Sequence, residues 1–170
     1  MKKMVNDVRI VGAGQAKYSK ASDRTIPQLI HEAGSVALRN AGLEWHMVDG
    51  LAITSFLLPP DNSATIAEQF GLEPRFLFQG LYGGASGIIG LSHAARAIHD
   101  GACDVALVVA ADAFNVESHN NTLDHFNGSV RDFMSPQGFG GANGMFALHT
   151  RLYMERYGAV EEDFGHFCIS

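Results

Sequence analysis

Residues 76–111 read FLFQGLYGGASGIIGLSHAARAIHDGACDVALVVAA, and this stretch decides the fold. An apolar, strand-like segment, Phe76 to Leu81, leads through a bend of small residues into a helix-like segment, Ile88 to Asp100. The last segment, Val105 to Ala111, is apolar throughout, which is typical of a parallel strand covered by helices on both faces. This order predicts a right-handed strand–helix–strand unit of a parallel sheet.

The sequence before this stretch alternates strands and helices in the same way. Further strands are predicted at 8–11 and 48–54, and further helices at 26–41 and 63–70. The first of these helices begins with a capping box, Thr25 to Gln28, and ends at a glycine. Four strands that alternate with helices predict the α/β class, with a parallel βαβαβαβ sheet.

The pattern changes after Asp112. Residues 113–144 are polar, rich in Gly, Asn and Ser, and lack periodicity, so we expect a loop insertion there. Helical spacing returns at Met145, and an apolar stripe is still open at Ser170. We therefore expect residues 1–170 to be one domain that either belongs to a longer polypeptide or packs on a partner.

The composition narrows the class of partner. The chain has 170 residues, 46% of them hydrophobic, and a net charge of −6, which argues against nucleic acid or anionic membrane as a partner bound by charge. No apolar run is long enough to span a bilayer. The two cysteines, Cys103 and Cys168, do not form a disulfide framework, so we expect a reducing, cytoplasmic location. Cys103 lies beside Asp104, which favours a structural role over a nucleophilic one.

Two common site motifs are incomplete. Gly12 and Gly14 follow a predicted strand, but Lys17 replaces the third glycine of the dinucleotide fingerprint and no helix is predicted to begin there. The eight histidines include His93 and His99, which lie six residues apart on one predicted helix and so face different directions. We therefore expect neither a dinucleotide site nor a metal site.

The bend Gly83-Gly84-Ala85-Ser86-Gly87 is the candidate site. A strand that runs straight into a helix presents backbone N–H groups and the positive end of the helix dipole, which stabilise negative charge. The bend holds no Cys, and Ser86 does not complete a Gly-x-Ser-x-Gly motif because Ile88 fills the last position. Alternatively, the glycines only let the helix pack closely on the strand, and the residues alone leave both interpretations open.

Several stretches, in this order and spacing, resemble the thiolase superfamily, especially its sterol-carrier/lipid-transfer thiolase-like branch. They are Ile10-Val11-Gly12-Ala13-Gly14, Ala41-Gly42-Leu43, Val48-Asp49-Gly50-Leu51, Gly84-Ala85-Ser86-Gly87, the run from Ala94 to Val105, and Tyr153 to Phe164. The resemblance implies a thiolase-like layered αβα fold, of which these residues would form the N-terminal half.

The resemblance also implies a chemistry. Family members that transfer acyl groups carry Cys where Gly84 stands, and Gly84 cannot form an acyl-enzyme. Thiolase-like proteins without this Cys resemble acyl-CoA retro-aldolases that act in lipid or steroid side-chain breakdown with an OB-fold partner. The leading expectation is therefore retro-aldol cleavage of a β-hydroxyacyl-CoA. The alternatives are a non-catalytic acyl-CoA- or lipid-binding subunit and an acetyl-CoA acetyltransferase-type thiolase.

The resemblance assigns the residues of the bend to a site. Gly84 and Ser86 stand at the position of the missing nucleophile, while Tyr82, Gly83, Ala85 and Gly87 are expected to contact substrate. It implies an acyl-CoA substrate, no metal, and no cofactor besides the coenzyme A of the substrate. It also implies a homodimer formed through the strand Phe76–Leu81. Since the family's second half is missing here, we expect these residues alone to be inactive.

Overall fold

The computed structural model describes residues 7–19, 23–124, 127–139 and 141–169. The chain divides into two compact units, Met1–Ala113 and Phe114–Ser170. The boundary falls where the sequence pattern changes after Asp112. The first unit holds the sheet, and its helices and strands are α1 (Ile26–Ala41), β1 (Gly50–Ile53), α2 (Ser63–Gln69), β2 (Phe76–Gln79), α3 (Ser86–His99) and β3 (Ala106–Val109), with a short 3₁₀ helix at Trp45–Met47.

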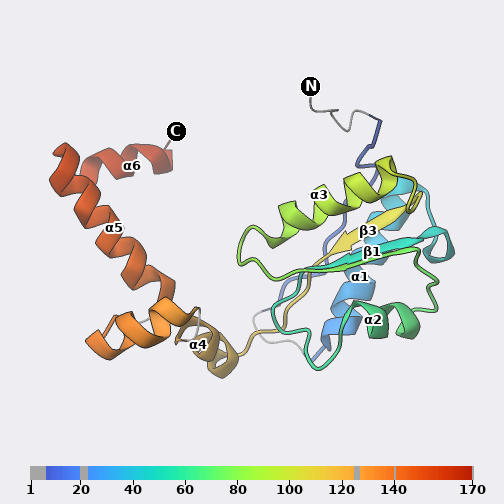
Figure 1. Ribbon diagram of the computed structural model, residues 1–170, viewed down its shortest axis with the longest axis horizontal. Coiled ribbons are helices and arrows are strands. Elements are labelled where there is room, and N and C mark those ends of the chain that lie inside the picture. The colour runs from blue at the N-terminus through green and yellow to red at the C-terminus, as the bar shows by residue number, and fades with distance from the viewer. Residues whose placement is uncertain (1–6, 20–22, 125–126, 140, 170) are drawn as a thin grey trace. The chain divides into compact units, whose positions relative to one another are not determined.

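The sheet of the first unit is parallel, with strand order β2-β1-β3. Gly50 of β1 pairs with Phe76 of β2 on one side and with Ala106 of β3 on the other. All four residues of β1 are buried, as expected for the central strand. Helix α3 lies on one face of the sheet, and α1 and α2 lie on the other (Figure 1). The α/β class is confirmed.

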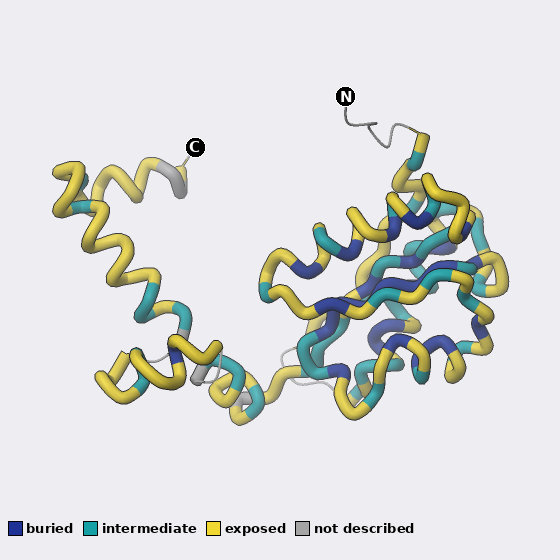
Figure 2. The backbone as a smooth tube through the Cα atoms, in the orientation of Figure 1, coloured by how far each residue is buried: buried dark blue, intermediate teal, exposed yellow. Residues whose placement is uncertain are grey.

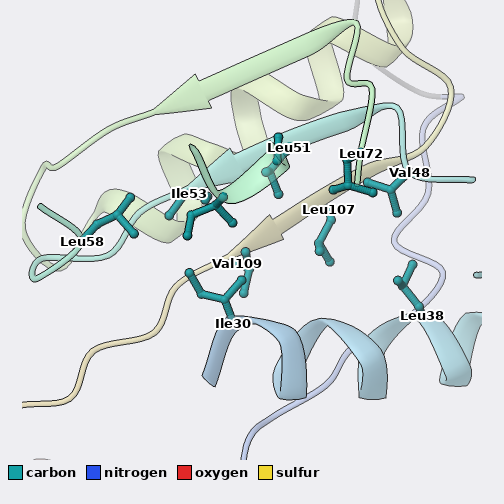
Figure 3. Close-up of a cluster of buried hydrophobic side chains, with 11 residues drawn as sticks. Ile30, Leu38, Val48, Leu51, Ile53, Leu58, Leu72, Leu107 and Val109 are labelled. Carbon is teal, nitrogen blue, oxygen red and sulfur yellow. The ribbon is translucent and has the colours of Figure 1, made fainter. Parts of the chain in front are cut away.

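Buried aliphatic side chains hold α1 and α2 against the sheet. Ile30 and Leu38 of α1 point toward Leu107 and Val109 of β3 (Figure 3). The dark blue segments of Figure 2 follow the strands and the inner faces of these helices. On the opposite face, a Cβ added to Gly90 of α3 would lie 3.1 Å from side-chain atoms of both Thr54 and Val108. This small residue therefore lets α3 approach the sheet closely.

The prediction of a strand at residues 8–11 is wrong, because these residues form no strand. Ile10 and Val11 are 78% and 64% exposed. The following residues instead lie against α1, where the Asn40 side-chain amide donates a hydrogen bond to the Ala13 carbonyl at 2.8 Å. A Cβ added to Gly12 would lie 2.3 Å from the Ala37 carbonyl oxygen, so only glycine allows this approach. The described sheet thus has three of the four expected strands.

The second unit is helical, including the segment expected as a loop. Its elements are α4 (Val116–Asp124), a π-helical turn (Val130–Met134), a 3₁₀ turn (Ser135–Gln137), α5 (Gly141–Tyr157) and α6 (Glu161–Ile169). The prediction of a loop at residues 113–144 is therefore wrong, because most of the described residues in this segment are helical. The polar residues cap helices: the Asn115 side chain accepts from the Ser118 amide at 2.7 Å, and the Asn127 side chain from the Val130 amide at 2.9 Å. The side chain of Cys168 lies outside the described residues.

Candidate functional site

The strand–bend–helix junction predicted from the sequence is present. Strand β2 ends at Gln79, and the Gly80 amide donates to the Ile53 carbonyl at 3.2 Å, which keeps the chain beside β1 for one more residue. Gly83 then turns the chain with a φ of +62°, a conformation that glycine adopts without strain. Helix α3 begins at Ser86, two residues before the expected start. The bend therefore lies at the carboxyl edge of the sheet, where ligands of parallel α/β proteins bind.

The Ser86 hydroxyl holds the bend together. It accepts a hydrogen bond from the Tyr82 amide and donates one to the Gly83 carbonyl, both at 2.7 Å. Ser86 is 3% exposed, so these internal contacts occupy a side chain that substrate does not reach directly. Of the two residues placed at the nucleophile position, Ser86 thus has the geometry of a positioning residue, not of a nucleophile.

Gly84 and Gly87 lie under open space. A Cβ added at either position would meet no atom of the described chain within 4 Å, and both residues are exposed. Close packing within this unit therefore does not require glycine at 84 or 87, in contrast to Gly90. The Cβ of a cysteine at position 84 would therefore meet no neighbouring atom. The interpretation that the bend glycines serve only helix packing is not supported at these two positions.

The N-terminus of α3 has no side-chain cap. Ala85 occupies the N-cap position without a side-chain hydrogen bond, and the first turn contains no acidic residue. The first amides of an α-helix lack intrahelical acceptors and carry the positive end of the helix dipole. The Ser86 amide donates to the Gly83 carbonyl at 3.1 Å, which leaves the other amides of the bend as the candidate donors to an anion.

Apolar and aromatic side chains surround the bend. Tyr82 is 55% exposed, and Ile88 of α3 is 72% exposed. Phe78 of β2 stacks on the His93 ring with centroids 4.5 Å apart, which gives His93 a packing role that the sequence did not indicate. A Cβ at Gly80 would lie 2.6 Å from ring atoms of both Phe78 and Tyr82, so this glycine lets the two rings flank the backbone. The surface beside the bend is thus partly apolar and aromatic.

Asp112 lies at the edge of the candidate site, although no motif in the sequence points to it. It follows β3, and its carboxylate accepts a hydrogen bond from the Leu57 amide at 2.7 Å. Burial raises the pKa of Asp112 above its ordinary value, although hydrogen bonds from the Leu57 and Phe56 amides oppose this. Nearby, the Ser55 hydroxyl accepts from the Ala111 amide at 2.9 Å. These contacts tie the loop after β1 to the segment after β3, at the same edge of the sheet as the bend.

Cys103 lies at the opposite edge, before β3. It is fully buried against Gly50, where an added Cβ would lie 2.8 Å from its sulfur. Burial raises the pKa of the Cys103 thiol, and the Asp49 charge adds to this. These surroundings match the structural role predicted for it.

Among the described residues, no three His, Cys, Asp or Glu side chains are grouped so that they could hold a metal ion. No helix of the described residues is both long and apolar enough to cross a membrane.

The chain is similar to steroid-degrading lyases. It is 33% identical over 171 residues to a 17-hydroxy-3-oxo-4-pregnene-20-carboxyl-CoA lyase of Mycobacterium tuberculosis, a match that covers 95% of this chain and 43% of the lyase. It is 31% identical over 170 residues to a steroid side-chain-cleaving aldolase of Thermomonospora curvata, which covers 94% of this chain and 42% of the aldolase. An acetyl-CoA acetyltransferase of Methanocaldococcus jannaschii is 28% identical over 97% of the chain and 43% of that enzyme. No protein-family model matches.

The solved structure of an Ltp2-ChsH2(DUF35) aldolase has the same fold. Its TM-score is 0.72 at 32% identity, and the match covers 92% of this chain and 40% of that chain. These similarities support a thiolase-like relationship, and the α/β unit is consistent with half of a thiolase-like fold. The chain spans less than half the length of the relatives that it matches.

Proposed function

We propose that the bend 83–87 stabilises a thioester enolate during retro-aldol cleavage of a β-hydroxyacyl-CoA by the complete protein. The observation that carries this proposal is the open, uncapped helix N-terminus over Gly84 and Gly87, in a chain similar to CoA-thioester lyases. The absence of a Cys at position 84 fits a reaction that forms no bond to the protein.

The reaction requires a surface that stabilises the negative charge of a thioester enolate. A base removes the proton of the β-hydroxyl group, the bond between the α and β carbons breaks, and its electron pair passes to the thioester as an enolate. A carbonyl product leaves, and a proton then returns to the α carbon. The bend amides would donate to the enolate oxygen as its charge develops, without having to reorganise. Ser86 would hold these donors in place through Tyr82 and Gly83.

The names of the relatives suggest the substrate class. One acts on a pregnene carboxyl-CoA, and another cleaves steroid side chains. We propose a CoA thioester attached to a steroid or another bulky apolar group. The exposed Ile88 would contact that group, and Gly84 leaves space that a larger residue would fill.

We also propose two protein contacts. In the described sheet β2 forms one edge, and its Leu77 is exposed, so two copies could pair through this strand, as the resemblance to thiolases implies. The solved aldolase pairs Ltp2 with a ChsH2(DUF35) component, which supports a separate partner protein for the complete protein.

The test is an assay of the complete protein, with its partner, on a steroid β-hydroxyacyl-CoA. Mass spectrometry should detect both cleavage products, and intact-protein mass spectra should show no acyl adduct during turnover. Gly84→Leu should lower kcat/KM by about a hundredfold, because the new side chain would displace the thioester. Gly165→Leu on α6 is the matched control, since Gly165 is also open, and it should leave kcat/KM unchanged.

Two results would contradict the proposal. An acyl adduct on any residue of this chain would indicate acetyltransferase-type chemistry. Tight acyl-CoA binding without cleavage, tested over several β-hydroxyacyl-CoA substrates, would instead indicate a non-catalytic binding subunit.

A further inference from the structure

The loop between β1 and α2, residues 54–62, begins beside the candidate site. In the described sheet β1 is the central strand, so the chain leaves it between the point where β2 leads into the bend and the point where β3 leads to Asp112. The hydrogen bond from the Gly80 amide to the Ile53 carbonyl, at 3.2 Å, keeps the start of the bend next to the end of β1. The loop after β1 therefore separates the bend from Asp112 at the carboxyl edge of the sheet.

Two side chains hold this loop to the segment after β3. The backbone pairing of β1 with β3 ends with the last residues of the two strands, and side chains continue the connection beyond it. The Ser55 hydroxyl accepts from the Ala111 amide at 2.9 Å, and the Asp112 carboxylate accepts from the Leu57 amide at 2.7 Å. The two contacts are reciprocal, because each segment provides one side-chain acceptor and one backbone donor.

The other end of the loop is fixed in the same way. The side chain of Gln79, the last residue of β2, accepts from the amide of Ser63, the first residue of α2, at 2.9 Å. Between the two ends, Leu58 is 3% exposed and belongs to the hydrophobic core. Phe56 and Leu57 are only half-buried, so this well-anchored loop presents apolar side chains at the carboxyl edge.

Asp112 is suited to hold two adjacent amides of one loop. Hydrogen bonds from both the Leu57 and the Phe56 amides favour its charged form, while burial acts against it and raises the pKa of Asp112. Among the described residues, no lysine, arginine or histidine forms an ion pair with it. A carboxylate offers two acceptor oxygens, whereas an asparagine offers one. A buried carboxylate without a cation is typical of functional sites.

We propose that Asp112 is a positioning residue of the candidate site, which holds the Phe56 and Leu57 amides so that the loop after β1 forms a fixed wall beside the bend. The inference rests on the proposed function, since this wall would contact the acyl group of the substrate. The wall does not contact the thioester, whose enolate the bend would stabilise. Loss of Asp112 should therefore weaken substrate binding more than it slows cleavage, whereas a change to the bend donors should mainly slow cleavage.

Steady-state kinetics of the complete protein, with its partner, on a steroid β-hydroxyacyl-CoA give the first test. Asp112→Ala should raise KM by about tenfold and change kcat by less than about threefold. Asp112→Asn keeps one of the two acceptors and should raise KM by only about threefold. Asp100→Ala is the control, because Asp100 is exposed at the other end of α3, and it should leave both constants unchanged.

Amide hydrogen exchange of the same proteins tests the contact itself, without substrate. In Asp112→Ala the amides of Phe56 and Leu57 should exchange about tenfold faster than in the wild type. In Asp112→Asn at least one of the two amides should stay protected. The Ser63 amide, which Gln79 holds at the other end of the loop, is the internal control and should exchange at the wild-type rate.

A substrate analogue separates this inference from the proposed reaction. A saturated steroid acyl-CoA has no β-hydroxyl group and cannot be cleaved, and isothermal titration calorimetry measures its dissociation constant. A wild-type protein that binds the analogue but cleaves no β-hydroxyacyl-CoA would contradict the proposed reaction. About tenfold weaker binding of the analogue by Asp112→Ala would still support the positioning role.

Four outcomes would overturn the positioning role. Wild-type exchange of the Phe56 and Leu57 amides in Asp112→Ala would show that the carboxylate does not hold the loop. Fast exchange with a wild-type KM and a wild-type affinity for the analogue would show that the loop is not a wall of the site. A lower kcat with a wild-type KM would assign Asp112 to the reaction itself. Should Asp112→Ala not fold, Asp112→Asn decides, and a wild-type KM in that variant would overturn the proposal.

Discussion

Asp49, which precedes β1, and Arg75, which precedes β2, form an ion pair in which the Arg75 Nε lies 3.1 Å from the Asp49 Oδ2. The same carboxylate accepts hydrogen bonds from the amides of Asp104 at 2.9 Å and Val105 at 2.8 Å, at the start of β3. One side chain thus connects the amino ends of all three strands. Burial alone would raise the pKa of Asp49, but the Val105 and Asp104 amides and the Arg75 charge outweigh it and hold the pKa below its ordinary value.

Asp49→Ala should destabilise the first unit by about 1–3 kcal/mol, because it leaves strand amides without their acceptor. Arg75→Ala should cost less, about 0–1 kcal/mol, because the arginine is largely exposed and its ion pair is screened by water. Urea unfolding of both variants gives the comparison. An equal decrease in the free energy of unfolding of both variants would show that Asp49 stabilises the unit through the ion pair and not through its hydrogen bonds to the amides.

The contribution of Asp112 to the free energy of unfolding should fall as the pH rises through the acid range. Its pKa is raised in the folded chain, so the folded state holds the proton more tightly than the unfolded state does. That contribution is complete below the unfolded pKa, about 3.9, and is lost as the pH rises through the folded pKa. Asp112→Asn should remove this component while it keeps an acceptor for the Leu57 amide. Thermal melts of both proteins across the acid range measure the difference, and identical profiles would contradict the expectation.

Gly34→Ala should destabilise the chain by about 1–3 kcal/mol, because a Cβ there would overpack the interface between α1 and its neighbours. The added atom would lie 2.6 Å from the Trp45 Cη2 and 3.2 Å from the Leu107 Cδ2. Gly84→Ala is the matched comparison and should change the free energy of unfolding by less than about 0.5 kcal/mol, because the space above it is open. Urea unfolding of both variants checks this, and a large loss at Gly84 would mean that the bend is packed.

Ser86→Ala should lower both stability and turnover. The variant removes an acceptor and a donor that are buried inside the bend, which we expect to cost about 1–3 kcal/mol. In the complete protein, kcat should fall more than KM changes, because misplaced donors mainly affect the enolate. Ser92→Ala on the exposed side of α3 is the control. A wild-type kcat for Ser86→Ala would remove Ser86 from the mechanism.

The sequence was informative wherever the pattern is local. The capping box of Thr25 and Gln28 and the left-handed Gly42 bound α1 as predicted, and the apolar runs located β1, β2 and β3. It was less informative for residues 113–144, where polar side chains such as Asn115 cap helices. It also missed Asp112, because the partner of that carboxylate lies 55 residues away in the chain.

By itself, the sequence determined the α/β class, the parallel direction of the strands and the small-residue bend before α3, because periodicity and turn chemistry act between near neighbours. The tertiary structure alone decided that residues 8–11 lie outside the described sheet. It also decided that the Ser86 hydroxyl makes its hydrogen bonds inside the bend, and that Gly84 faces open space while Gly90 packs closely on the sheet. Those outcomes depend on which distant backbone and side-chain groups meet, and a periodic pattern carries no information about such meetings.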